Sequence, residues 1–103
     1  MCDAVSKHLA SHSIEIEPEN IVVAPGCKQA VLYAMMATLN PGDEVLLLAP
    51  AWPSYDGMLK LIGAVPVHVP VKRDDYHPDF AALEAAITPN TKAIMVNSPN
   101  NPT

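Results

Sequence analysis

The segment at positions 97–103 reads Asn-Ser-Pro-Asn-Asn-Pro-Thr and gathers amide side chains directly after an apolar run at 93–96. Open α/β sheets present their ligand-binding groups at the carboxyl ends of the strands. An amide-rich segment in this place is therefore typical of a binding loop. A solvent-exposed turn of asparagine and proline would have the same composition.

Gly26, Cys27 and Lys28 lie between an apolar run at 21–24 and a helical pattern that starts at residue 27. A glycine at a strand-to-helix turn lets the backbone approach a ligand, and the first N–H groups of the helix attract anions. These residues are candidates for a phosphate site. An ordinary tight turn explains them as well, because one glycine is a weak signal.

Trp52 is the only tryptophan and lies in a proline-flanked loop after the apolar run at 44–49. A flat aromatic side chain at the carboxyl end of a strand can stack on a planar ligand ring. The alternative is a tryptophan that covers the edge of the core.

The elements that must position these residues alternate between strands and helices. Apolar, β-branched stretches predict strands, and amphipathic spacing predicts helices between them. The predicted strands are at 21–24, 44–49, 64–71 and 92–96, and the predicted helices are at 3–12, 27–39, 54–62 and 78–87. This alternation predicts the α/β fold class, with a mainly parallel sheet between helices, and a length of 103 residues allows one small domain.

Several details of packing also follow from the pattern. The helix at 27–39 is apolar around most of its circumference, so we expect it to be mostly buried. Phe80, Leu83 and Ile87 are expected to face the core from the last helix. Pro66 and Pro70 each remove a backbone donor, which places residues 64–71 at a sheet edge or in an irregular extended segment. A charged loop at 72–77 follows that strand.

Composition excludes several partners. A net charge of -5 without a basic stretch gives no footprint for nucleic acid, and no apolar run approaches the roughly 20 residues that span a bilayer. The two cysteines, Cys2 and Cys27, form no metal or redox pattern, and His8 and His12 lack a third ligand, so we expect no metal. Positions 1–4 show no export signal, and the expected location is cytoplasmic.

Together, the segments at 24–30, 49–55 and 97–103 resemble the pyridoxal-phosphate-dependent aminotransferases of fold type I, class I/II, the aspartate-aminotransferase-like group. The resemblance spans nearly the whole chain in the family's order. It implies that residues 1–103 are the N-terminal part of the large, cofactor-binding domain, with a three-layer α/β/α architecture and no second domain.

The resemblance also implies roles for particular residues. Backbone amides at Gly26, Cys27 and Lys28 would hold the cofactor phosphate, with Cys27 in place of the family's commoner small residue. Trp52 would lie over the pyridine ring of pyridoxal phosphate. Asn101, in a match to the family's Asn-Pro-Thr-Gly motif, would hydrogen-bond the phenolic oxygen of the cofactor. Asn97 and Asn100 would shape the loop.

The implied function is amino-group transfer between an amino acid, aspartate or similar, and a 2-oxo acid, by an enzyme that is a homodimer when full length. No lysine of this chain lies in a segment like the family's Ser-x-x-Lys stretch, so no catalytic residue is assigned and the isolated chain is expected to be inactive. Carbon–sulfur lyases and cyclopropane-forming synthases of the same fold, the aminotransferase-like effector domain of a transcription regulator, and a truncated piece that binds nothing are the alternatives.

Overall fold

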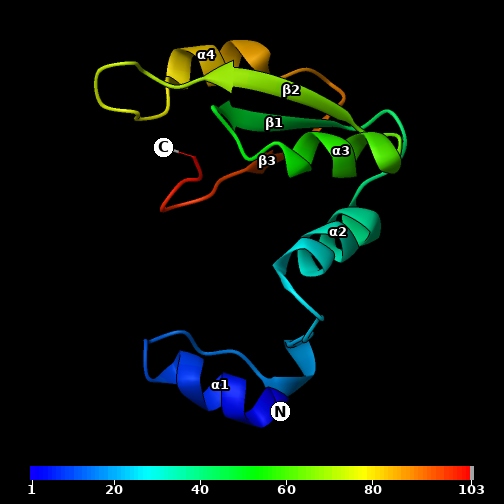
Figure 1. Cartoon of the computed structure of the whole chain (residues 1–103), viewed down its shortest axis with the longest axis vertical. Coiled ribbons are helices and arrows are strands. Elements are labelled where there is room, and N and C mark those ends of the chain that lie inside the picture. Colours follow the sequence, from blue (N-terminus) through cyan, green and yellow to red (C-terminus); the bar gives the residue numbers. More distant parts are fainter. Residues whose placement is uncertain (103) are drawn as a thin grey trace. The chain divides into compact units, whose positions relative to one another are not determined.

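The computed structural model describes residues 1–102, and the chain divides into two compact units, Met1–Tyr33 and Ala34–Thr103. Figure 1 shows the path of the chain. The helix α2 (Cys27–Thr38) begins in the first unit and ends in the second.

The first unit contains α1 (Cys2–Ala10), the short 3-10 helix η1 (Pro18–Asn20) and the start of α2. The Ser6 hydroxyl donates a hydrogen bond of 2.7 Å to the Ile16 carbonyl, which holds the segment after α1 against the helix. Residues 21–24 are irregular, so the prediction of a strand there is wrong. A β-branched run becomes a strand only where a neighbouring strand accepts its ladder, and no described residue pairs with this run. Val22 is accordingly 83% exposed.

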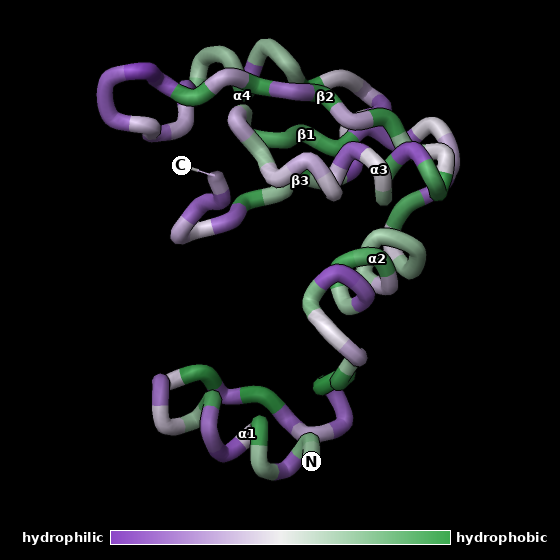
Figure 2. The backbone as a smooth tube through the Cα atoms, viewed as in Figure 1, coloured by the Kyte–Doolittle hydropathy of each residue, from purple (hydrophilic) through white to green (hydrophobic). Residues whose placement is uncertain are grey.

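The second unit is built on a parallel sheet of β1 (Glu44–Ala49), β2 (Val65–Pro70) and β3 (Thr91–Met95) in the order β2-β1-β3. These strands and the position of the proline-containing β2 at an edge confirm the predictions from sequence. After Glu44, the central strand is apolar to its end at Ala49 (Figure 2). Such a strand is suited to burial on both faces.

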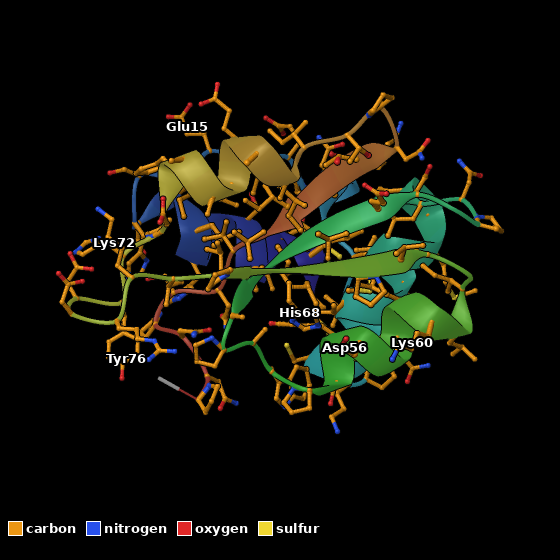
Figure 3. All side chains as sticks on the ribbon, turned by 90° about the horizontal axis from the view of Figure 1, so that it is seen from above. Glu15, Asp56, Lys60, His68, Lys72 and Tyr76 are labelled. Carbon is orange, nitrogen blue, oxygen red and sulfur yellow. The ribbon has the colours of Figure 1, made fainter. Side chains whose placement is uncertain are left out.

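Two helices connect the strands and cover opposite faces of the sheet. α3 (Ser54–Leu61) joins β1 to β2, and α4 (Phe80–Ala86) joins β2 to β3. The two connections run in opposite directions across the sheet, so right-handed crossovers place their helices on opposite sides. Figure 3 shows α4 in gold and α3 in green on either side of the strands. The predicted three-layer α/β/α arrangement is thus present in this unit.

The core follows the alternation of side chains along β1. Leu46 packs with Val69 and Leu83 on the α4 side. Val45 and Leu47, at alternate positions, face the α3 side, where Leu59 is fully buried. Both faces of β1 are therefore covered by apolar side chains.

Two predictions of burial are wrong. Met35 is the one buried residue of α2, whereas Met36 on the same helix is 59% exposed. In α4, Leu83 is buried as predicted, but Phe80 and Ile87 are 75% and 60% exposed. The sequence pattern identifies apolar faces correctly, but a face is buried only where another element covers it.

Asp79 begins α4 by accepting hydrogen bonds from the N–H groups of Ala81 and Ala82, both at 3.1 Å.

No helix within residues 1–102 is both long enough and apolar enough to cross a membrane.

The turn after α3 gives a first test. Gly63 has φ +79°, and an added Cβ would lie 3.1 Å from Cβ of Pro41, whereas Gly57 inside α3 has open space and a helical backbone. We expect Gly63→Ala to lower the free energy of unfolding by about 1–2 kcal/mol through backbone strain and crowding. The control Gly57→Ala should raise it by about 0.5–1 kcal/mol, because alanine is the better helix former. Urea denaturation followed by Trp52 fluorescence measures both, and equal effects would contradict the assigned turn.

Candidate functional site

A cavity of about 360 Å³ opens at the carboxyl ends of the strands in the second unit. Because β1, β2 and β3 are parallel, the segments that follow them all leave the sheet at this edge. Figure 2 shows the polar loop after β2 and the polar segment after β3 at the same end of the sheet. The floor is apolar and includes Leu47, Leu48, Met95 and Val96. The polar residues of the lining are Asn97, Ser98, Asn100, Asp75 and His77, with Tyr55 and Tyr76 beside them.

The segment after β3 is tied to the loop after β1. The side-chain Nδ2 of Asn100 donates a hydrogen bond of 3.0 Å to the carbonyl oxygen of Pro50. These residues follow different strands, so the bond joins two of the three predicted site segments, as the parallel arrangement requires. The sequence left the proline isomers open, and the Ser98–Pro99 and Asn101–Pro102 bonds are cis.

Trp52 is half-buried in the loop between β1 and α3. Its ring meets the Tyr55 ring edge-on, with centroids 5.3 Å apart and planes at 90°. Tyr55 is itself only 8% exposed and lines the cavity, so the pair has a fixed base in the core. Trp52 does not belong to the lining, and its predicted stacking on a ligand ring stays a prediction.

Asn101 is exposed and also lies outside the cavity lining, whereas Asn97 and Asn100 belong to it. From the sequence, Asn97 and Asn100 were expected only to shape the loop. Asn100 does shape the loop through its bond to Pro50, and it faces the cavity as well. The predicted contact between Asn101 and a cofactor oxygen is not tested by this geometry.

The Gly26 turn belongs to the first unit. Gly26 has φ +110°, its N–H donates to the Ala24 carbonyl at 2.8 Å, and no atom lies within 4 Å of where a Cβ would be. The N–H of Ala30 donates to the Gly26 carbonyl at 3.1 Å and opens the hydrogen-bonded ladder of α2. The N–H groups of the first helical turn come before Ala30 in the chain, ahead of the first hydrogen bond within the helix. The uncrowded backbone before a helix of 12 residues suits a phosphate group, and Cys27 beside it is an exposed free thiol.

The loop between β2 and α4 is the part of the cavity that sequence reasoning missed. It was predicted only as a charged loop, yet Asp75, Tyr76 and His77 all line the cavity. An antiparallel bridge between Val71 and Pro78 closes its base, and the His77 N–H donates to Asp75 Oδ1 at 2.9 Å. Tyr76 has φ +57°, which side-chain-bearing residues rarely adopt. The available signal was its place after a parallel strand, at the same edge as the asparagine segment.

The charges of the site are sparse. Of the described residues that line the cavity, Asp75 is the one carboxylate, and none is a lysine or arginine. The imidazole of His68 on β2 is hydrogen-bonded to the carboxylate of Asp56 on α3, with Nε2 2.8 Å from Oδ1, on the α3 side of the sheet (Figure 3). Within residues 1–102, no three side chains that bind metals gather into one cluster. Among the described residues, the cavity lining therefore offers apolar walls and hydrogen-bonding groups, and no lysine or arginine.

Fold and site together define an α/β protein that presents its polar loops at the carboxyl edge of a parallel sheet. Comparison with known proteins makes this specific: the family model "Aminotransferase class I and II" matches residues 1–103. The chain belongs to this family, as the resemblance in its motifs implied.

Similar proteins agree with this assignment. A protein of Thermus aquaticus named "Probable aspartate/prephenate aminotransferase" is 47% identical over 98 residues, which are 94% of this chain and 26% of that protein. The structure of aspartate aminotransferase from Thermus thermophilus with maleate aligns with TM-score 0.93 and 40% identity over 99% of this chain and 27% of that one. N-Succinyldiaminopimelate aminotransferase from Mycobacterium tuberculosis aligns with TM-score 0.93 and 35% identity over 99% of this chain and 28% of that one. The chain thus spans about a quarter of the length of the relatives that it matches.

The bond between Asn100 and Pro50 gives a second test. Asn100→Ala removes the side-chain donor that joins the segment after β3 to the loop after β1. We expect a loss of about 1 kcal/mol in the free energy of unfolding, as for a typical hydrogen bond. Asn90→Ala, at an exposed position just before β3, is the matched control and should change it by less than about 0.5 kcal/mol. If the two variants unfold alike in urea, the bond does not hold the cavity edge together.

Proposed function

We propose that residues 1–103 are part of the large, cofactor-binding domain of a pyridoxal-phosphate-dependent aminotransferase. The proposed reaction is amino-group transfer between an amino acid, aspartate or similar, and a 2-oxo acid. The observation that carries this proposal is the meeting of the asparagine segment with the Trp52 loop at the carboxyl edge of the sheet, through the Asn100–Pro50 bond. The family match over the same residues supports it.

The Gly26 turn is proposed to bind the cofactor phosphate. Its positive φ and open surroundings allow close approach of an anion to the backbone, and the N-terminus of α2 adds a favourable dipole. Cys27 and Lys28 contribute backbone N–H groups in the first helical turn. Because a backbone donor does not depend on the side chain, cysteine in place of a smaller residue keeps this function.

Trp52 and Asn101 are proposed to hold the cofactor ring. The Tyr55 ring packs edge-on against Trp52, and the flat indole is a surface on which a pyridine ring could stack. The side-chain amide of Asn101 would donate a hydrogen bond to the phenolic oxygen of the cofactor. When bound, pyridoxal phosphate supplies an electron sink for bonds at the α-carbon of the amino acid.

This chain supplies binding groups and, in the proposal, no catalytic group. The cavity carries no lysine or arginine among the described residues of its lining, so the proton-shuttling lysine and the cations that receive substrate carboxylates come from outside it. Pairing of two full-length subunits, a cytoplasmic location, and independence from membranes and nucleic acid stay predictions. The aspartate preference rests on the names of the relatives, which include aspartate/prephenate and N-succinyldiaminopimelate aminotransferases.

The test separates binding from turnover. Pyridoxal phosphate affinity is measured by equilibrium dialysis for the wild-type chain, Asn101→Ala, and the control Asn90→Ala at the amino end of β3. We expect Asn101→Ala to weaken binding about tenfold, the effect of one lost hydrogen bond, and Asn90→Ala to leave it unchanged.

Amino transfer from aspartate to a 2-oxo acid is then assayed with the 103-residue chain and with any longer protein that contains it. We expect binding without turnover by the chain, and turnover by a longer protein that adds the lysine. Failure of both to bind the cofactor would refute the proposal.

A further inference from the structure

The hydrogen bond between His68 and Asp56 joins β2 to the first turn of α3. Nε2 of His68 lies 2.8 Å from Oδ1 of Asp56, and Figure 3 shows the two labelled side chains next to each other. An ionised carboxylate only accepts hydrogen bonds, so Nε2 is the donor. The bond therefore ties the start of the helix to the edge strand of the sheet.

The register of the sheet places His68 where it can reach the helix. His68 pairs with Leu47 of β1, and paired residues of neighbouring strands point to the same side of a sheet. Leu47 is fully buried on the α3 side, so His68 also points toward α3. In α3, Asp56 lies three positions before the fully buried Leu59, so these two residues share a face of the helix. The bond is thus a consequence of how α3 packs on the sheet.

The start of α3 lacks the usual local support. Its N-cap residue is Pro53, which makes no side-chain capping bond. The helix is only eight residues long, and Gly57 in its interior is a poor helix former. Asp56 places a negative charge near the positive end of the helix, and its bond to His68 fixes that carboxylate on the sheet. The bond to β2 is therefore a tertiary support for a turn that its own sequence holds weakly.

Trp52 depends on the same turn. The N–H of Tyr55 donates to the Trp52 carbonyl at 3.0 Å, and the two rings meet edge-on with centroids 5.3 Å apart. Tyr55 directly precedes Asp56, so a displacement of Asp56 also displaces the residue against which Trp52 packs. Asp56 and His68 themselves lie outside the cavity lining. Any influence of these two residues on the site passes through Tyr55 and Trp52.

We propose that His68 and Asp56 are positioning residues for Trp52. Their bond holds the first turn of α3 on β2, and this turn keeps the indole in the orientation in which it meets Tyr55. The consequence for the cofactor rests on the proposed function, in which Trp52 stacks on the pyridine ring. The consequence for Trp52 itself does not, because the bond and the ring contact are both present in the chain alone.

Acrylamide quenching of fluorescence tests the positioning in the folded 103-residue chain without cofactor, because Trp52 is the only tryptophan. Once the first turn is released from β2, the indole loses its place beside Tyr55 and becomes more accessible to the quencher. We expect His68→Ala and Asp56→Ala to raise the quenching constant by the same amount. The double variant should raise it no further, because both substitutions remove one and the same bond.

Two variants serve as controls. His68→Gln retains a side-chain N–H donor and should return the quenching constant to the wild-type value. Thr88→Val removes the hydroxyl that bonds Glu44 at the other end of β1, so it weakens the fold by a similar hydrogen bond without touching α3. It should leave the quenching of Trp52 unchanged. Far-ultraviolet circular dichroism confirms that each variant is folded.

Equilibrium dialysis with pyridoxal phosphate then tests the consequence for the site. We expect His68→Ala to weaken binding about threefold, less than the loss of a direct contact, because the effect is transmitted through Tyr55. An unchanged quenching constant in His68→Ala, a rise that His68→Gln does not reverse, or an equal rise in Thr88→Val would overturn the positioning role. If the wild-type chain does not bind the cofactor, the proposed function fails, while the quenching series still decides whether the bond positions Trp52.

Discussion

β1 pairs in parallel with a neighbour on each side, and the arrangement of the whole Ala34–Thr103 unit depends on this double pairing. The middle of the strand has to be apolar on both faces, since Leu46 and Leu47 point to opposite faces and both are buried. Parallel pairing also decides where function is placed, because all three strands deliver the chain to the same edge. A hairpin-connected sheet of the same residues would send alternate loops to opposite ends.

The cavity is the direct result of that constraint. One segment follows β1, another follows β2 and the asparagine segment follows β3, and each contributes to the same lining. The Asn100–Pro50 bond then fixes two of these segments against each other, while the bridge between Val71 and Pro78 fixes the third. Rigid strands with short, internally bonded loops are a suitable support for ring and hydrogen-bonding groups.

Much of this was predictable from the sequence because strand pairing and crossover handedness follow general rules. The three strands of the sheet, all four helices and the proline-marked edge were predicted from apolar runs and spacing. The irregular conformation of residues 21–24 was not predicted, because a strand requires a pairing partner, and the sequence pattern alone does not reveal whether one is present. The exposure of Met36, Phe80 and Ile87 has the same cause, since burial depends on what covers a face. The cavity-lining role of Tyr76 escaped prediction because a polar loop carries no periodic signal.

The central claim is that this chain carries the cofactor-binding groups of an aminotransferase. The most direct measurement is a titration of the isotope-labelled 103-residue chain with pyridoxal phosphate, followed residue by residue in amide and indole nuclear magnetic resonance spectra. We expect the largest shifts at the backbone amides of Gly26 to Lys28, at the Trp52 indole and at the Asn101 side chain. Saturable shifts confined to other parts of the chain, or no shifts at all, would contradict it.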